Sequence, residues 1–435
     1  MSKKKSTIFA LSTPTGKGAI AIIRISGTLS YHCVKKISKN MPEKQNIATF
    51  NEVIDGGGNI VDQTVTTYFK APKSFTGEDV VEMSVHGGGA VIKKIINLLK
   101  KTKGMRLATP GEFTRRAFEN NKLDLTQVEA IADIVNAETE MQRKQAISHL
   151  SGHFFKETKN IFENLKKILS NIEAIIDFSE EDLPENLIAD IKEQIENNIN
   201  KISVIISSAP KGISIRDGFL VAVLGKPNSG KSSFINYISG KDVSIVTNQP
   251  GTTRDLIESF VDISGYPVRF VDTAGIRKSS DFVEKIGIEK AISVSKEADI
   301  NIVLIENNKD ILYFKNIPKS IIVRSKQDIN GGVFDGGSFF NISSKNGYGI
   351  NDLLEVLRGR LSGTGRKENI SISRERHVEC LKNVVDHLKK SKEIKSMDIF
   401  AEDIRQSVKS IASLFGTVDI EDILDIIFSD FCIGK

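Results

Sequence analysis

A loop that binds phosphate groups is indicated by residues 225–232, which read Gly-Lys-Pro-Asn-Ser-Gly-Lys-Ser. The two glycines permit backbone torsions and close approaches that a β-carbon would obstruct. Backbone N–H groups and the dipole of the next helix would hold anionic phosphates, while Lys231 reaches the terminal phosphates and the Ser232 hydroxyl ligates Mg²⁺. The apolar run 219–224 predicts a buried strand that leads into the loop. We infer a nucleoside triphosphatase.

Two further stretches complete the phosphate side of this predicted site. Residues 251–255 read Gly-Thr-Thr-Arg-Asp and would close over the γ-phosphate, with Thr253 completing the magnesium shell. Residues 272–275 read Asp-Thr-Ala-Gly at the end of a predicted strand. There Asp272 would hold the metal through water, and the Gly275 N–H would sense the γ-phosphate.

Two segments are predicted to read the base. Residues 325–328 read Ser-Lys-Gln-Asp, and a carboxylate at Asp328 would accept both N–H donors of guanine, an edge that adenine lacks. Residues 343–345 would back the base, and the five elements together resemble the GTPase superfamily. Because the motif usually begins with Asn and Ser325 is shorter, we expect weaker nucleotide binding, with guanine selection left mainly to Asp328. The residues predicted to bind GTP are Asn228, Ser229, Gly230, Lys231, Ser232, Ser233, Thr247, Thr252, Thr253, Asp272, Thr273, Ala274, Gly275, Lys326, Asp328, Ser343, Ser344 and Lys345.

The residue that positions the attacking water is displaced from its usual place. Ras-like enzymes carry a glutamine directly after the Asp-x-x-Gly motif, whereas this chain has Ile276, which has no hydrogen-bonding capacity. Asn228 resembles the asparagine of GTPases that bind K⁺ in place of an arginine finger. Glu284 resembles the carboxylate that orients water in one such family, and its alternative interpretation is a solvated helix residue.

The composition predicts a cytoplasmic protein of two or three domains. The chain has 435 residues, 40 % hydrophobic and 26 % charged. It lacks an apolar run near the roughly 20 residues of a membrane span, and its start lacks the features of a signal peptide. Three widely separated cysteines argue against a disulfide framework or a zinc module. The net charge of +5 permits an RNA partner without demonstrating one.

The periodicity of apolar residues divides the chain into an α+β part, a helical part and a doubly wound α/β part. Helical periodicity resumes after the α/β part, which predicts an inserted domain whose flanking helices pack as one bundle. The predicted domains are an N-terminal α+β domain at 1–122, a helical domain at 123–217 and 362–435, and a Ras-like doubly wound P-loop domain at 218–361.

Particular strands and polar loops are also predicted. In the α+β part we expect strands within 7–25 and at 61–69 and 80–85, and a helix at 89–100. Polar clusters at 74–79, 86–89 and 109–116 are candidate ligand walls. In the α/β part, strands are predicted at 219–224, 256–263, 268–271, 300–305, 321–323 and 339–342.

Motifs along the entire chain resemble one family. Beside the inserted nucleotide domain and its Gly-Thr-Thr-Arg-Asp segment, residues 281–289 read Asp-Phe-Val-Glu-Lys-Ile-Gly-Ile-Glu and residues 432–435 read Cys-Ile-Gly-Lys. The N-terminal part carries Arg-Ile-Ser-Gly at 24–27, Pro-Gly-Glu-Phe at 110–113 and Asn-Lys-Leu-Asp-Leu at 121–125. Together these resemble MnmE, also called TrmE, a family of tRNA modification GTPases.

The resemblance implies a homodimer formed through an N-terminal domain that binds a 5-formyltetrahydrofolate-type folate. The positions that match the folate contacts are Arg24, Glu82, Lys122 and Lys435. With the flavoprotein MnmG, in a heterotetramer, the family adds an aminomethyl or carboxymethylaminomethyl group to C5 of the wobble uridine of certain tRNAs; neither DNA nor a membrane is an implied partner. The resemblance also implies K⁺-stimulated hydrolysis through dimerisation of the nucleotide domains, with K⁺ bound by Asn228, Thr247, Gln249 and Thr252.

Some functional readings remain open. Cys432 is either a nucleophile in the one-carbon chemistry or a residue that lines the pocket. Basic pairs such as Arg115 and Arg116 are candidates for contact with tRNA phosphates, although solvation also explains them. The principal alternative function is a ribosome-assembly GTPase of the Era or Der type, although a second phosphate loop and a KH-type Gly-x-x-Gly loop are missing. A third is a folate-dependent methyltransferase in which GTP is only regulatory.

Overall fold

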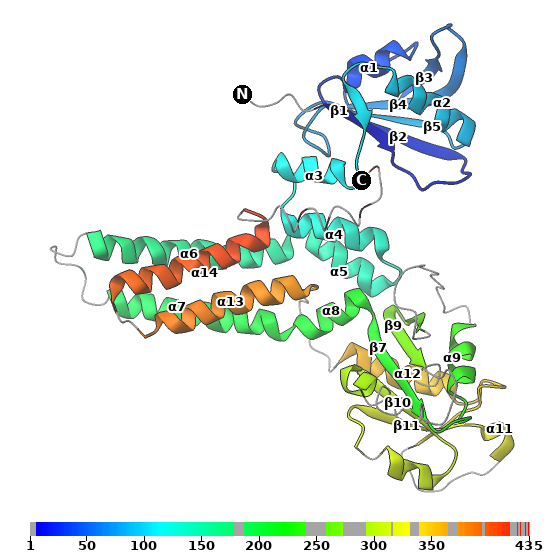
Figure 1. Cartoon of the computed structure of the whole chain (residues 1–435), viewed down its shortest axis with the longest axis vertical. Coiled ribbons are helices and arrows are strands. Elements are labelled where there is room, and N and C mark those ends of the chain that lie inside the picture. The colour runs from blue at the N-terminus through cyan, green and yellow to red at the C-terminus, as the bar shows by residue number, and fades with distance from the viewer. Residues whose placement is uncertain are drawn as a thin grey trace, which may run out of the picture. The chain divides into compact units, whose positions relative to one another are not determined.

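The chain divides into two compact units, the first made of Met1–Ala132 with Ile411–Lys435 and the second of Asp133–Ser410. Figure 1 shows the computed structural model. It describes residues 6–177, 187–240, 258–272, 293–314, 316–330, 339–363, 372–393, 396–417, 424, 427, 431 and 434. Within these ranges, no helix has both the length and the apolar character needed to cross a bilayer.

The first unit contains a six-stranded sheet whose order is β3-β4-β5-β2-β1-β6. Neighbouring strands are antiparallel, except that β1 and β6 are parallel. The strands are β1 (Thr7–Leu11), β2 (Ile20–Ser26), β3 (Thr49–Ile54), β4 (Ile60–Phe69), β5 (Val80–His86) and β6 (Met105–Leu107). The helices α1 (Ser30–Lys36) and α2 (Gly89–Lys100) pack on this sheet, and α2 buries Ile95 and Leu99 completely against it.

The sequence predicted the apolar elements of this unit and missed two others. The strands at 61–69 and 80–85 and the helix at 89–100 are confirmed. The two strands that were not predicted are β3 and β6. Of the six residues of β3, only Asn51 and Val53 are buried, and no residue of the short β6 is. Neither strand therefore carries the alternation of apolar residues on which the prediction depended.

The C-terminal segment returns to the first unit. Two helices, α3 (Glu112–Glu119) and α4 (Leu125–Asn136), follow the sheet. Leu125 and Val128 of α4 form an apolar cluster with Leu424 and Phe431, from the other end of the chain. Burial of these side chains fixes Leu424 and Phe431 against α4.

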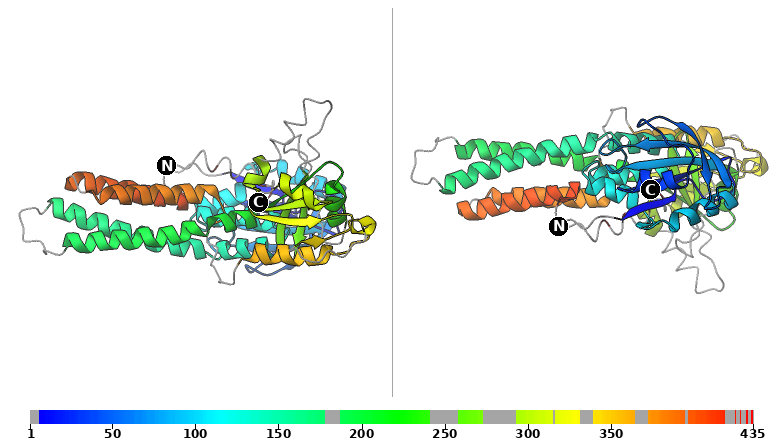
Figure 2. Two further views of the ribbon diagram at one scale, coloured as in Figure 1. Left: turned by 90° about the horizontal axis from the view of Figure 1, so that it is seen from below. Right: turned by 90° about the horizontal axis from the view of Figure 1, so that it is seen from above.

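The second unit begins with helices whose apolar faces pack together. Its long helices run side by side in both views of Figure 2, and α7 contacts both α6 and α13. Because α6 and α7 precede the α/β segment and α13 follows it, helices from both sides of that segment pack against one another. The helices are α5 (Glu140–Leu150), α6 (His153–Asp177), α7 (Leu187–Ser207), α8 (Ala209–Asp217), α13 (Glu375–Ser391) and α14 (Met397–Phe415), the last of which continues into the first unit.

The α/β segment contains a second six-stranded sheet, with the order β12-β11-β10-β7-β9-β8. All neighbours are parallel except β8 and β9. The strands are β7 (Phe219–Gly225), β8 (Glu258–Ile263), β9 (Tyr266–Asp272), β10 (Ile300–Ile305), β11 (Ser320–Arg324) and β12 (Phe340–Asn341). Each of the six predicted strands corresponds to a strand among the described residues. The central parallel strands β7 and β10 were recognised best, because strands buried on both faces read as continuous apolar runs. The helices of this segment are α9 (Lys231–Ser239), η1 (Asn308–Tyr313, a 3₁₀-helix), α11 (Gln327–Asn330) and α12 (Ile350–Ser362).

One carboxylate joins the two places at which the chain passes between the helices and the α/β segment. Asp133 Oδ1 accepts hydrogen bonds from Arg216 Nε at 3.1 Å and from Arg374 Nη2 at 2.6 Å. Arg216 lies in the last turn of α8, directly before β7, and Arg374 is the N-cap of α13. The shared carboxylate therefore holds both connecting segments at one point of the helical part.

Candidate functional site

The phosphate loop connects β7 to α9, and its backbone requires glycine at two positions. A β-carbon on Gly225 would lie 2.5 Å from the carbonyl oxygen of Leu304 and 2.5 Å from Ser229 Oγ, so no larger residue fits. Gly230 is the N-cap of α9 and has a φ of 93°, in the region that favours glycine. The loop therefore delivers its backbone N–H groups to the start of α9, where a helix binds anions.

Lys231 is held over the loop that precedes it. Lys231 is 5 % exposed, and its Nζ donates to the carbonyl oxygens of Gly225 at 2.9 Å and Lys226 at 2.8 Å. These carbonyls keep the ammonium group beside the loop, from which it would turn toward a phosphate that binds there. The neighbouring Ser229 is buried and Ser233 is exposed.

The fold brings together two oxygen ligands that are 40 positions apart in the sequence. Ser232 Oγ donates to Asp272 Oδ2 at 2.6 Å, and Asp272, at the end of β9, is 3 % exposed. No group of three or more His, Cys, Asp or Glu suited to a metal occurs among the described residues. A hydroxyl and a single carboxylate nevertheless fit Mg²⁺, which takes its remaining ligands from water and phosphate oxygens.

Asn228 is an exposed residue of the phosphate loop. Its φ of 64° is left-handed, a conformation that asparagine adopts more readily than most residues. Its side chain is open to solvent, so it is available to a ligand.

The predicted base-reading residues gather after β11 and β12. Ser343 Oγ donates to Asp328 Oδ1 at 2.7 Å, and this hydrogen bond lowers the pKa of the exposed Asp328 below its ordinary value. The backbone N–H of Lys345 donates to Ser343 Oγ, and Ser344 is half-buried beside it. Asp328 is therefore an ionised acceptor at neutral pH, as recognition of the two guanine donors requires.

Two further residues of the base-reading motif, Ser325 and Lys326, are occupied within the fold. Ser325 is 3 % exposed, and its hydroxyl donates to the carbonyl oxygen of Ile305 on β10 at 3.4 Å. Lys326 has a φ of 59°, and its Nζ donates to Glu306 Oε1 at 2.8 Å. The short Ser325 side chain is thus directed at the adjacent strand.

Several predicted site residues lie outside the residues that the structure describes, and their roles stay predictions. They are Thr247, Gln249, Thr252, Thr253, Thr273, Ala274, Gly275, Glu284, Cys432 and Lys435.

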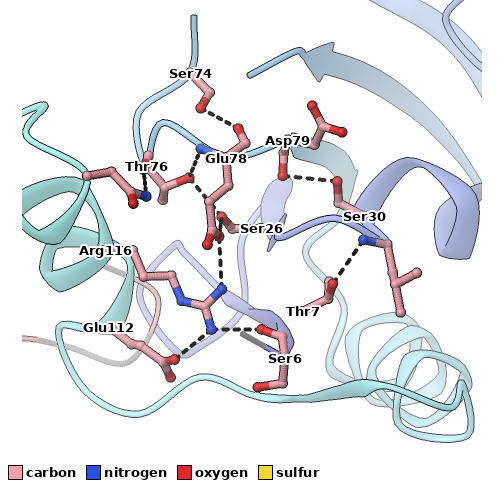
Figure 3. A network of polar contacts seen from close by, with 12 residues as sticks. Ser6, Thr7, Ser26, Ser30, Ser74, Thr76, Glu78, Asp79, Glu112 and Arg116 are labelled. Atoms are coloured by element: carbon pink, nitrogen blue, oxygen red, sulfur yellow. Dashed lines mark hydrogen bonds and ion pairs between the residues drawn. The ribbon is translucent and has the colours of Figure 1, made fainter. Parts of the chain in front are cut away.

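A second polar site is centred on Arg116 in the first unit, as Figure 3 shows. Its Nη1 donates to Glu78 Oε2 at 2.8 Å, and its Nη2 donates to Glu112 Oε1 at 2.9 Å and to the carbonyl oxygen of Ser6 at 2.8 Å. The Ser26 hydroxyl also donates to Glu78 Oε2, at 2.8 Å. Arg116 is 3 % exposed, so neither open reading of it, contact with tRNA phosphates or solvation, fits this buried guanidinium.

Two of the three predicted polar clusters meet here and the third does not. The ion pair of Glu78 and Arg116 joins the cluster 74–79 to the cluster 109–116. The cluster 86–89 lies past the other end of β5, whose seven residues span roughly 20 Å. There the ring of His86 is fixed by Asp62, with 2.7 Å between Nδ1 and Oδ1.

Arg24 and Glu82 are cross-strand partners on β2 and β5. Arg24 Nε donates to Glu82 Oε1 at 2.7 Å. The guanidinium of Arg24 also lies 5.4 Å from the ring centroid of Phe75 and 5.7 Å from that of Phe113. Lys122 Nζ donates to the carbonyl oxygen of Pro72 at 3.1 Å, just before the same 74–79 cluster. The three described residues of the predicted folate set therefore surround one loop.

Gly434 packs against the end of β1. The Ser12 hydroxyl donates to the carbonyl oxygen of Gly434 at 2.9 Å, and a β-carbon on Gly434 would lie 2.1 Å from the carbonyl oxygen of Leu11. Ala10, which precedes Leu11 in β1, is the strand partner of Arg24. No local pattern in the sequence indicated this role of Ser12, since a serine in a loop is usually only solvated.

Two family models together match most of the chain. The model described as "MnmE helical domain" matches residues 125–432, and the model described as "GTP-binding protein TrmE N-terminus" matches residues 7–122. The chain is 37 % identical over 433 residues to a "tRNA modification GTPase MnmE" of Dinoroseobacter shibae, which covers 99 % of this chain and 100 % of that protein. It is 40 % identical over 442 residues to the protein of the same name from Ehrlichia chaffeensis, with the same coverage.

One solved structure resembles a part of the chain. A crystal structure of Era from Aquifex aeolicus covers 39 % of this chain and 66 % of that chain, with 23 % identity and a TM-score of 0.26.

Proposed function

The chain belongs to the MnmE family of tRNA modification GTPases, and on this basis we propose that it hydrolyses GTP while modifying the wobble uridine of certain tRNAs. In this proposal the chain acts with the flavoprotein MnmG and adds an aminomethyl or carboxymethylaminomethyl group to C5 of that base. The observation that best supports GTP hydrolysis is the contact between Ser232 Oγ and Asp272 Oδ2, which lie 2.6 Å apart beside the phosphate loop. Because the relatives match over their full length, the Era-type alternative is not favoured.

The described residues suggest how GTP would be held. Lys231 would leave the carbonyls of Gly225 and Lys226 and pair with the β- and γ-phosphates, exchanging two neutral acceptors for charged ones. Ser232 and Asp272 would hold Mg²⁺, with Thr253 completing its shell, and the ion would neutralise charge on the phosphate oxygens. Asp328 would select guanine by accepting its N1–H and its amino group.

For hydrolysis we propose the cation-assisted mechanism that the resemblance implies. Asn228, with Thr247, Gln249 and Thr252, would hold K⁺, whose charge would replace that of an arginine finger. Glu284 would orient the attacking water. The exposed, left-handed Asn228 supports this proposal, because an exposed side chain in the phosphate loop is available to a ligand. Contact between two nucleotide domains would then complete the site.

Replacing potassium by sodium at equal ionic strength is expected to slow GTP turnover by about 10-fold or more, because the smaller ion does not fit a potassium site. The Asn228→Ala variant should be slow in both salts and should lose the difference between them. The measurement is phosphate release under saturating GTP. Equal wild-type rates in the two salts would count against the role of Asn228 and for conventional positioning of water.

We also propose that the first unit binds a formyl-tetrahydrofolate-type folate through Arg24, Glu82, Lys122 and Lys435. A pterin presents a donor edge that suits Glu82, and a glutamate tail would be attracted to lysine and arginine. Supporting this, Arg24 and Glu82 are paired at 2.7 Å, and the exposed ring of Phe75 lies beside them. The nearby tail, fixed through Gly434, would bring Cys432 and Lys435 to the same region, with Cys432 as either nucleophile or pocket wall.

We propose that this unit also forms the homodimer. Its edge hairpin exposes three large apolar side chains: Phe50 at 58 %, Ile60 at 52 % and Val65 at 43 %. Phe50 and Val65 are strand partners on β3 and β4. Exposed apolar residues on an edge strand are unfavourable in a monomer and typical of an interface.

The experiment that tests the proposed function is mass spectrometry of nucleosides from total tRNA. A strain without the protein, but with the partner flavoprotein, should lack 5-aminomethyl-type wobble uridines, and the wild-type chain should restore them. Unchanged tRNA with accumulating ribosome precursors would contradict the proposal. Gly434→Ala, whose β-carbon would collide with Leu11 O, should restore about a tenth or less of the modification yet retain wild-type GTP turnover. The same change at Gly359, where a β-carbon meets open space, is the matched control.

A further inference from the structure

An ion pair joins the phosphate loop to the turn that follows β10. Lys226 Nζ lies 2.6 Å from Asp310 Oδ1, and the Asp310 side chain is only 5 % exposed. The same ammonium group lies 4.2 Å from the ring centroid of Tyr313, in a cation–π contact. Two side chains of η1 therefore hold the second residue of the phosphate loop.

The other carboxylate oxygen of Asp310 connects this pair to the base-reading loop. Asp310 Oδ2 accepts from the backbone N–H groups of Glu306 and Asn307, both at 3.2 Å. The side chain of Glu306 in turn accepts from Lys326 Nζ at 2.8 Å. The phosphate loop and the base-reading loop are thus joined through one polar chain, which we call the Lys226–Asp310 link.

The main chain of Lys226 bears directly on the phosphate site. Its carbonyl oxygen accepts from Lys231 Nζ at 2.8 Å and from the backbone N–H of Ser229 at 3.2 Å. A shift of Lys226 would therefore move both the ammonium group and a backbone donor of the loop. The position of the Lys226 side chain is consequently tied to the geometry that receives the phosphates.

We propose that Lys226 and Asp310 are positioning residues that fix the spacing between the phosphate-binding and base-reading loops, and so preform the site for a guanine nucleotide. This inference rests on the proposed binding of GTP. A nucleotide must contact both loops at once. If the loops are already correctly spaced, less conformational entropy is lost when the nucleotide binds. The link touches neither the water nor the γ-phosphate in this proposal. Its loss should therefore weaken nucleotide affinity and leave kcat nearly unchanged.

A purely local role for Asp310 is the competing explanation. Asp310 is the third residue of η1 and closes a capping box with Asn307, so the carboxylate also stabilises the turn itself. Burial would raise the pKa of Asp310, but hydrogen bonds from Lys226 and from two backbone amides outweigh it and lower the pKa. Asp310→Asn separates the two roles, because the amide oxygen still accepts from the backbone while the charge that pairs with Lys226 is lost.

The test is to titrate the full chain with a fluorescent GDP analogue and to measure GTP turnover in the same buffer. Asp310→Asn and Lys226→Met are each expected to raise the Kd for GDP and the KM for GTP by about 10-fold, with kcat within about twofold of wild type. Lys226→Arg, which retains the charge, should bind nearly as wild type. The double variant should bind about as weakly as either single variant, because both remove the same interaction.

Lys309→Met is the matched control, because Lys309 is an exposed lysine in the same turn and only its backbone N–H is used there. Wild-type nucleotide affinity in Asp310→Asn and Lys226→Met would overturn the inference. Additive effects of the two changes would do so too, since independent residues do not form a link. A wild-type chain that binds no GDP would instead contradict the proposed GTPase function, so the two failures are distinguishable.

Discussion

Replacing Lys231 by alanine is expected to lower kcat/KM for GTP by at least about 100-fold. Lys231 is 5 % exposed, and two carbonyl oxygens hold its ammonium group beside the phosphate loop, at 2.9 and 2.8 Å. In that position it is the buried cation of the loop that can meet the charge of the terminal phosphates. Without it, the phosphates would face neutral backbone donors and the proposed Mg²⁺ and K⁺ ions, and would lose the charge that the loop itself supplies. The measurement is steady-state phosphate release across a range of GTP concentrations.

The control for this variant must separate lost chemistry from lost folding. Lys192→Ala removes an exposed lysine of α7, outside the predicted site, and should turn over GTP as wild type. Thermal melting without nucleotide should place Lys231→Ala close to the wild-type Tm, since its carbonyl partners can accept hydrogen bonds from water once the lysine is removed. A folded Lys231→Ala protein with turnover within threefold of wild type would remove Lys231 from the phosphate site.

Replacing Arg116 by methionine is expected to destabilise the first unit by about 3 kcal/mol, because the change leaves Glu78 without its ion-pair partner, whereas Glu112 keeps its pair with Arg106. The two carboxylates approach the guanidinium at 2.8 and 2.9 Å, and the side chains of Arg116 and Glu112 are only 4 % and 10 % exposed. Methionine fills a similar volume, so packing is largely retained and the lost pairing dominates. The effect would be measured by chemical denaturation of the full chain, with unfolding of the first unit monitored by hydrogen exchange in residues 6–132.

Arg115→Met provides the matched control one position away. Its side chain is 37 % exposed and pairs with Glu119 on the helix surface at 3.3 Å, a pairing worth roughly 0.5 kcal/mol or less. The two variants remove the same group from the same helix, so the difference between them isolates burial. Equal stability of the two variants would contradict the role assigned to the Arg116 network.

The same network predicts how the first unit responds to acid. Burial would raise the pKa of Glu112, but hydrogen bonds from Arg106, Thr109 and Arg116 outweigh it and lower the pKa from 4.5 to about 2. A depressed pKa contributes stability that is fully present above the unfolded value, so this contribution should disappear as the pH falls from about 4.5 to about 2. In Arg116→Met the first unit should lose less stability in acid, because the pKa of Glu112 is lowered less when Arg116 is absent.

The sequence predicted the α/β part of the fold well because its strands are buried on both faces. Such strands form uninterrupted apolar runs, so β7 and β10 were recognised almost to the residue. The edge strand β3 was missed because its residues alternate weakly and only Asn51 and Val53 are buried. The periodicity of apolar residues reflects which side chains are buried, and an edge strand buries few of them.

The candidate phosphate site was also readable from the sequence, because phosphate binding depends on short-range geometry. A turn that needs glycine at 225 and 230, followed directly by lysine and serine, specifies its own conformation within eight residues. The contact of Ser232 with Asp272 follows from the parallel order of β7 and β9, whose carboxyl ends meet at the same edge of the sheet.

By itself, then, the sequence determined the family, the α/β strands and the loop that would hold phosphates, since each depends on residues that are close together in the chain. The tertiary structure alone decided which charges are paired and which are open. It buried Arg116 between Glu78 and Glu112, seated Gly434 against Leu11, and joined Lys226 to Asp310. The physical reason is that a charged side chain looks the same in the sequence whether water or a distant partner compensates it, and only the folded chain supplies the partner.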